Sequence, residues 1–158
     1  PAAAGKTAVA RKLWKQLPRT ALIELDAVKW LVSDCKSDDS DLRLAGRAGL
    51  EMAKTYLSSG VSVIVEKAFC RKKYLLPFVA YARRKKIRVL VYNLEAPWKT
   101  IEKRIKTREH HMSLGKAERI FGEYSRNLFK VDQTFDTSSS SIKEIVDSIK
   151  KDALRKSS

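Results

Sequence analysis

The sequence predicts an α/β protein built on a parallel β-sheet with helices on both faces. Two observations favour this fold class. Short, nearly continuous apolar runs recur along the chain, and each is followed by a longer segment with apolar residues at helical spacing. The run at 61–65, Val-Ser-Val-Ile-Val, is rich in β-branched residues, as expected for a strand buried on both faces. Alternation of such strands with helices is typical of a sheet that helices cover on both sides.

The expected elements follow one another without an internal repeat or a linker. The expected strands cover 21–25, 61–65, 88–94 and 133–136. The expected helices cover 7–17, 41–59, 72–85, 97–108, 117–128 and 141–154. Residues 27–40 and 109–115 are expected to be irregular. Gly60 is suited to end one helix, and Ser141 with Glu144 fits a capping box that starts the last one.

Length and composition favour a single domain over residues 1–158. The chain is 44% hydrophobic and 32% charged, which is too apolar for a disordered protein. Its apolar runs fall well short of the roughly 18 residues that a membrane span needs, so no membrane association is expected. Cys35 and Cys70 are expected to be reduced thiols of a cytoplasmic protein, with a single disulfide as the alternative.

The chain is strongly basic. Lys and Arg total 33 against 18 Asp and Glu, a formal net charge of +15. Such a field favours polyanionic partners, which include nucleotides and nucleic acid. A lysine-rich surface organised in ion-pair networks is an equally good interpretation. The charge therefore bears on partners rather than on the fold.

A phosphate-binding motif opens the chain. Pro1-Ala2-Ala3-Ala4-Gly5-Lys6-Thr7 matches G-x-x-x-x-G-K-[ST] except for the first glycine, which falls one residue before Pro1. Backbone amides of such a loop hold phosphate oxygens together with the start of the next helix. Lys6 is predicted to act in catalysis by reaching the β- and γ-phosphates, and Thr7 is predicted to bind Mg²⁺. The predicted ATP-binding residues of this loop are Ala3, Ala4, Gly5, Lys6, Thr7 and Ala8.

The fold class requires a strand before the first helix. We expect the natural chain to carry roughly six apolar residues and a glycine before Pro1, which together would supply that strand and complete the motif. An ordinary helix start with Thr7 as its cap is the alternative interpretation of the motif.

A carboxylate follows each of two predicted strands. Asp26 follows 21–25 and Glu66 follows 61–65. Because the carboxyl ends of parallel strands meet at one edge of a sheet, both are expected to face the phosphate-binding loop. Asp26 is the candidate catalytic base, and Glu66 is a candidate ligand of Mg²⁺ or of the acceptor. A turn role for Asp26 and a surface position for Glu66 are the simpler alternatives, and Lys67 is expected to offset the Glu66 charge.

Other side chains are candidates for contacts with the acceptor and with adenine. Trp30 and Arg71 are candidate acceptor ligands, with packing and surface positions as alternatives. Thr137 and Ser138 follow the last predicted strand and are candidates for contacting the nucleotide, although a turn explains them equally well.

A basic helix is predicted to form part of a lid over about 99–115. Arg104 and Arg108 are four residues apart and share one helix face, from which guanidinium groups can contact a transferring phosphoryl group. Gly115 is expected to lie in a mobile loop that permits closure. A solvated basic face is the alternative.

In their order along the chain, these features resemble the small AAA-33-type P-loop kinases, which are similar to the chloramphenicol phosphotransferase, adenylylsulfate kinase and polynucleotide 5′-hydroxyl kinase families. The residues that carry the resemblance are Gly5-Lys6-Thr7, Glu24-Leu25-Asp26, Val65-Glu66, Arg104 with Arg108, and Phe135-Asp136-Thr137-Ser138. It implies a P-loop NTPase three-layer sandwich with strand order 2-3-1-4-5, ATP and Mg²⁺ as cofactors, Asp26 as base, and lid arginines. Residues 27–47 match no subgroup, so the acceptor stays open.

Three functions are compatible with these residues. The leading prediction is an ATP-dependent kinase that phosphorylates a hydroxyl of a small molecule, nucleoside or nucleotide. A polynucleotide 5′-hydroxyl kinase is the close alternative, favoured by the net charge. A nucleotide- or nucleic-acid-binding module without catalysis is the third.

Overall fold

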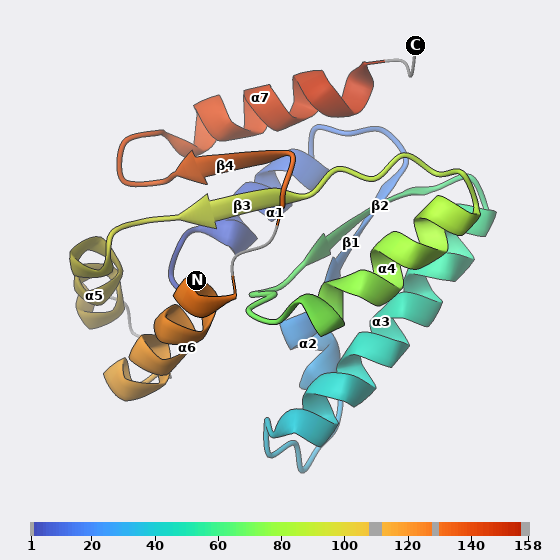
Figure 1. Cartoon of the computed structure of the whole chain (residues 1–158). Helices are drawn as coiled ribbons and strands as arrows, with labels where there is room; N and C mark the ends of the chain where they lie inside the picture. Colours follow the sequence, from blue (N-terminus) through green and yellow to red (C-terminus); the bar gives the residue numbers. More distant parts are fainter. Residues whose placement is uncertain (1, 108–111, 128–129, 156–158) are drawn as a thin grey trace.

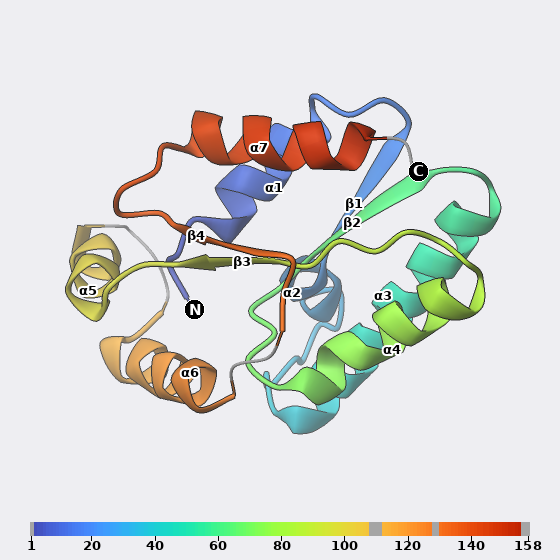
Figure 2. The same ribbon diagram turned by 45° about the horizontal axis from the view of Figure 1, so that its top comes forward.

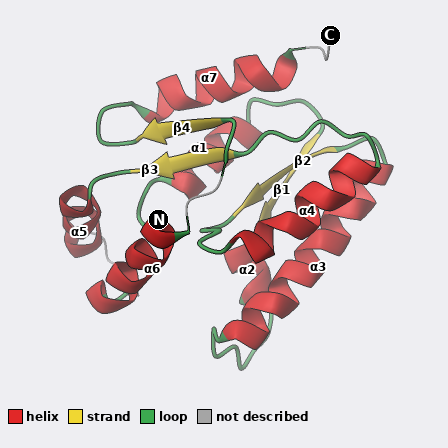
Figure 3. Cartoon of the chain, viewed as in Figure 1, coloured by secondary structure: helices red, strands yellow, loops and turns green. Residues whose placement is uncertain are grey.

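The computed structural model describes residues 2–107, 112–127 and 130–155. Helices and strands alternate along them (Figures 1 and 3). The strands are β1 (Thr20–Glu24), β2 (Ser62–Glu66), β3 (Tyr92–Glu95) and β4 (Gln133–Asp136). The helices are α1 (Lys6–Trp14), α2 (Leu25–Lys29), α3 (Asp39–Ser58), α4 (Lys72–Arg84), α5 (Trp98–Thr107), α6 (Leu114–Arg126) and α7 (Ile142–Leu154). No described helix is both long and apolar enough to cross a bilayer.

The strands pair in parallel, which confirms the α/β class. β1 pairs with β2 from Thr20↔Ser62 to Glu24↔Glu66, and β3 pairs with β4. Within the described residues these pairs form two separate two-stranded sheets instead of the continuous sheet that was expected. The expected order 2-3-1-4-5 makes neighbours of the same two pairs, because β1 to β4 are its second to fifth strands. The order across the two pairs stays a prediction.

Helices cover both faces of the strands (Figure 2). α1 packs against α7 on one face, and α3 packs against α4 on the other. One apolar core joins α1 and α7 to β3 and β4, and its buried members are Ala4, Val9, Leu13, Leu94, Phe135, Ile145, Val146 and Ile149. A second core, around Ile23, Leu25 and Ala53, lies between β1, β2 and the α3–α4 layer. α5 and α6 follow the carboxyl end of β3 (Figure 1).

Local sequence signals explain several helix ends. The Asp38 side chain accepts hydrogen bonds from the backbone amides of Ser40 and Asp41 and so starts α3. Gly60 follows α3 with φ of 72°, a left-handed conformation that favours glycine. The predicted capping box of α7 is confirmed, because Ser141 and Glu144 exchange side-chain to backbone hydrogen bonds.

Three local predictions were wrong. The third strand begins at Tyr92 instead of residue 88, because its partner β4 begins only at Gln133. Part of the segment expected to be irregular forms α2, which starts directly after β1, so Asp26 lies in a helical turn. Gly115 lies inside α6 and not in a loop, because the Ser113 side chain caps that helix at the amide of Lys116.

Candidate active site

The phosphate-binding motif forms a tight turn that ends in α1. Ala3 and Gly5 both have positive φ, of 52° and 81°. Residues of this conformation in close succession turn backbone amides toward one concave side, which suits an anion. Among the described residues no side chain caps α1, and its first turn contains no acid. The loop and the helix start are therefore suited to bind phosphate.

Lys6, Thr7 and Glu66 meet beside this loop. Glu66 ends β2 and is 8% exposed. Burial raises the pKa of its carboxyl, while the Lys6 charge and a hydrogen bond with the Thr7 hydroxyl act in the opposite direction. Burial likewise lowers the pKa of the Lys6 ammonium, and the charges of Glu66 and Asp26 oppose that change. The expectation that Glu66 faces the loop agrees with these contacts.

Asp26 accepts two ammonium groups at the end of β1. Lys67 Nζ lies 3.0 Å from Asp26 Oδ1, and Lys29 Nζ lies 3.8 Å from it. Both lysine side chains are under one tenth exposed, whereas that of Asp26 is 56% exposed. Partial enclosure alone would raise the pKa of Asp26, but Lys67, Lys29 and Lys6 outweigh it, so the pKa is lowered. The Asp26 carboxylate is thus kept ionised at an open edge of the site.

The sequence did not reveal this lysine pair in its full role. Lys67 was expected only to offset the charge of neighbouring Glu66, yet it bonds Asp26, which is 41 residues away in the chain. Lys29 carried no prediction. A lysine one turn after Asp26 was a usable signal once α2 is known, because residues three apart share a helix face.

A second carboxylate at the strand ends was also missed. Glu24 stands opposite Glu66 in the β1–β2 register. It binds the Arg11 guanidinium through both of its oxygens, at 2.6 and 2.8 Å. A bidentate pair of this kind holds α1 against the end of β1.

Arg104 joins the phosphate-binding loop to the turn after β4. Its guanidinium donates to Thr137 Oγ1 at 2.9 Å, to the Thr137 carbonyl at 2.6 Å and to the Ala3 carbonyl at 3.3 Å. Three predicted site residues from distant parts of the chain therefore meet. Arg104 is anchored to protein atoms here, a contact that the lid prediction did not include. Arg108 lies outside the described residues.

The turn after β4 is held by its own polar groups. Ser138 donates from its amide and its hydroxyl to Asp136 Oδ1, at 2.8 and 2.6 Å. Thr137 donates from its amide to the Glu95 carbonyl at 2.8 Å, which ties the turn to β3. Both residues fulfil the turn role that was given as their alternative.

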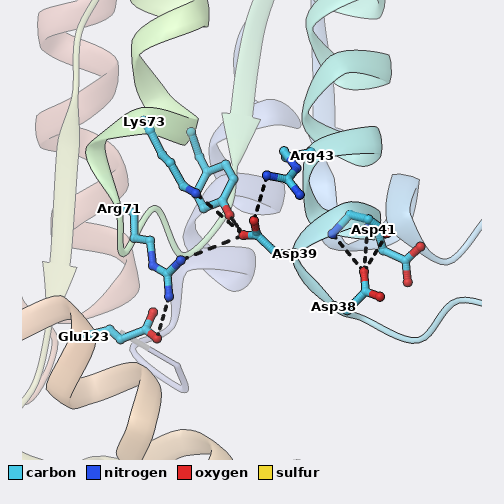
Figure 4. Close-up of polar contacts among 9 residues, drawn as sticks. Asp38, Asp39, Asp41, Arg43, Arg71, Lys73 and Glu123 are labelled. Atoms are coloured by element: carbon cyan, nitrogen blue, oxygen red, sulfur yellow. Dashed lines mark hydrogen bonds and ion pairs between the residues drawn. The ribbon is translucent and has the colours of Figure 1, made fainter.

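The predicted acceptor residues lie on the rim of the molecule. Trp30 caps the end of α2, is 59% exposed and carries Lys29 Nζ 4.6 Å from its ring centroid. Arg71 precedes α4 and bonds Glu123 of α6 at 3.1 Å, with Asp39 3.9 Å away (Figure 4). Arg43 and Lys73 also approach Asp39. Arg71 thus belongs to an ion-pair network that links α3, α4 and α6.

A hydrogen-bonded group fastens α6 to β3. Tyr124 donates to Glu95 Oε2 at 2.7 Å and accepts from the Asn93 side chain at 2.6 Å. Burial and the bond to Glu95 raise the pKa of Tyr124 to about 12. Cys70 and Cys35 are free thiols, as expected, and Cys70 Sγ lies 3.8 Å from the Ile120 carbonyl.

The donor atoms of the site suit a magnesium nucleotide. A hydroxyl and a carboxylate, from Thr7 and Glu66, are hard oxygen ligands of the kind that Mg²⁺ prefers, and Mg²⁺ usually keeps water and phosphate oxygens as its other ligands. The described residues contain no group of three or more His, Cys, Asp or Glu side chains able to hold a metal by themselves. The site therefore fits a metal that arrives with phosphate.

Solved structures share this fold. The tunicamycin resistance protein of Deinococcus radiodurans is 15% identical with a TM-score of 0.69, over 99% of this chain and 92% of that chain. A sugar kinase of Janibacter sp. HTCC2649 is 18% identical with a TM-score of 0.70, over 94% and 87%. The APS kinase CysC of Mycobacterium tuberculosis, in complex with AMPPNP and APS, is 17% identical with a TM-score of 0.67, over 92% and 88%.

These likenesses establish the fold, since all three identities are low. No curated protein is significantly similar to the chain in sequence. The match to a protein family is more specific. The sequence model of the AAA domain family AAA_33 matches residues 1–121, which is more than half of the chain, and the chain therefore belongs to this family.

Proposed function

We propose that the protein is an ATP-dependent phosphotransferase that transfers the γ-phosphoryl group to a hydroxyl of a small molecule, nucleoside or nucleotide. One observation carries the proposal. The Lys6 ammonium interacts electrostatically with both Glu66 and Asp26, so the phosphate-binding loop and the two strand-end carboxylates form one site. Phosphoryl transfer depends mainly on positioning and charge neutralisation, which such a group can provide.

The loop would hold the nucleotide. Backbone amides of Ala3 to Ala8 would bind phosphate oxygens, and Lys6 would neutralise charge on the β- and γ-phosphates. Thr7 and Glu66 would hold Mg²⁺, whose contact is supported by the hydrogen bond between them. ATP with Mg²⁺ supplies the transferable phosphoryl group. Thr137 and Ser138 would lie near the base, on the turn that Arg104 ties to the loop.

Asp26 would act as the catalytic base. The acceptor hydroxyl would give its proton to the Asp26 carboxylate as the new O–P bond forms and the bond to the ADP oxygen breaks. The lowered pKa of Asp26 keeps it ionised at neutral pH, and its exposed edge leaves room for an acceptor. Trp30 would form a wall of the acceptor pocket, and Arg71 would bind an acceptor anion by exchanging its contact with Glu123.

An acceptor screen tests the activity. The protein is incubated with radiolabelled ATP, Mg²⁺ and panels of metabolites, nucleosides and 5′-hydroxyl oligonucleotides. Label transfer to one class of hydroxyl is the expected result. Nucleotide binding without transfer to any acceptor would instead support a non-catalytic module and contradict the kinase.

Asp26→Asn tests the base. We expect kcat to fall about 10²–10⁴-fold while ATP affinity stays within a factor of a few, because the loss of a general base removes a contribution of that size. Asp34→Asn is the matched control, since Asp34 is an exposed carboxylate outside the site. Urea unfolding of both variants establishes that they are folded. Equal activity of the two variants would exclude Asp26 as base.

A polynucleotide 5′-hydroxyl kinase is the second candidate, supported by the net charge of +15. Lysine and arginine contacts with a phosphate backbone release counterions, so log Kd for an oligonucleotide should vary steeply with log salt. A slope near zero would exclude this candidate and leave a small-molecule acceptor. The free thiols at Cys35 and Cys70 support a reducing compartment, which agrees with the cytoplasm.

A further inference from the structure

An apolar groove of about 590 Å³ runs between β2 and β3. All residues of β2 line one wall, and the segment from Arg88 to Tyr92, with Leu94, lines the other. Lys6 and Glu66 lie at one end of it, so the groove leads to the candidate active site. Its two walls belong to the two separate strand pairs.

The strands beside the groove each have one partner. β2 pairs with β1 only, and β3 pairs with β4 only, among the described strands. The other edge of each carries backbone N–H and C=O groups, which in a protein interior need hydrogen-bond partners. Residues 88–91 have a strong strand pattern yet form no strand. A strand in the groove would supply partners to both edges and would extend β3 toward residue 88.

Helices enclose the groove from both faces. Val9, Leu13 and Ile149 of α1 and α7 line one face, and Ala53, Phe78 and Ala82 of α3 and α4 line the other. An occupant must therefore be apolar on both sides. A nearly continuous apolar strand meets this condition, whereas an amphipathic helix or a polar loop does not.

The start of the chain lies at the same groove. Ala4 is fully buried in the core cluster that contains Leu94 of β3, with Ile64 of β2 packed against that cluster. From Ala4 the chain turns through Gly5 into α1. A strand parallel to β2 and β3 would end at the carboxyl edge of the sheet, where this turn begins.

We propose that the groove is the binding site of a fifth, central parallel strand, formed by about five apolar residues immediately before Pro1 in the natural polypeptide. The strand hydrogen-bonds to β2 on one side and to 88–95 on the other. It joins the two strand pairs into one sheet and one domain. Its last residues lead into the phosphate-binding loop, whose conformation it holds.

Two N-terminal extensions of equal length test the proposal. One consists of alternating valine and isoleucine over five residues followed by glycine, and the other of serine and threonine followed by glycine. We expect the apolar extension to raise Tm by roughly 10 °C, because several apolar residues are buried, and the polar one to leave Tm unchanged. The apolar extension should also slow amide exchange at Val89 and Leu90.

Each other outcome overturns the proposal. Equal Tm values and equal exchange at Val89 and Leu90 for both extensions would show that the groove takes no strand from this side. Protection that rises with protein concentration, together with a dimer in light scattering, would identify a second copy as occupant. If the apolar extension aggregates, the same peptide added in trans to the 158-residue chain must slow those two amides. None of these readouts requires phosphoryl transfer, so their failure is separate from that of the proposed kinase.

Discussion

Asp26 and Glu66 lie at the ends of neighbouring strands, yet their carboxyl pKa values move in opposite directions. Burial dominates at Glu66 and raises its pKa, whereas lysine charges outweigh enclosure at Asp26 and lower its pKa. Two carboxylates with opposite shifts suit two different tasks. Both residues were predicted from their positions after strands. Their different environments depend on Lys29 and Lys67, whose contacts no sequence pattern indicated.

Lys67→Met tests the residue that holds Asp26. Because Lys67 lowers the Asp26 pKa, its removal should shift the acid limb of the kcat/KM profile toward higher pH. A group with a lowered folded pKa stabilises the fold above its unfolded pKa, and this contribution is lost as the pH falls through the folded pKa. The variant should therefore also show a weaker loss of stability on acidification, measured by urea unfolding at several pH values. Lys12→Met, at an exposed site on α1, removes the same charge and should leave both profiles unchanged.

At the scale of elements, the contact between α2 and α3 depends on one glycine. A Cβ on Gly49 would overlap the Leu25 side chain, whereas a Cβ on Gly46 of the same helix would meet open space. The helix pattern at 41–59 included Gly49 among its core-facing positions, but nothing in the sequence marked the close approach. That approach exists because Leu25, the first residue of α2, is buried against α3.

Gly49→Ala and Gly46→Ala should have opposite effects on stability. We expect Gly49→Ala to lower the free energy of unfolding by about 1–3 kcal/mol, because overpacking forces side chains or backbone to move. Gly46→Ala should raise it by about 0.5–1 kcal/mol, because alanine is the better helix former. Urea denaturation of both variants checks this pair. A loss of stability at Gly46 equal to that at Gly49 would contradict the packing argument.

At the scale of the whole molecule, Arg104 connects the first residues of the chain to its last strand. The bonds to the carbonyls of Ala3 and Thr137 link α5 to both the phosphate-binding loop and the turn after β4. The lid prediction correctly singled out this side chain, but its anchoring depends on parts of the chain more than 30 residues away on either side.

Arg104→Lys should weaken both this connection and nucleotide binding. A lysine keeps the charge but cannot reach three acceptors with a planar fork. We expect a loss of about 1–3 kcal/mol in unfolding free energy, the size associated with hydrogen bonds from a charged group, and a several-fold weaker affinity for ATP. Calorimetry with ATP and urea unfolding measure the two effects. Lys103→Met, a neighbouring exposed cation, should change neither quantity, and a normal Arg104→Lys protein would refute the connecting role.

The sequence by itself determined the α/β class, the phosphate-binding turn and the strand-end carboxylates, because these follow from local pattern: β-branched runs, helical spacing and the Gly5-Lys6-Thr7 tripeptide. Tertiary structure decided what those residues touch. Lys67 reaches Asp26, Arg104 reaches Ala3, and residues 88–91 line a groove instead of pairing. Such contacts join segments far apart in the chain, and they depend on packing geometry that local periodicity does not encode.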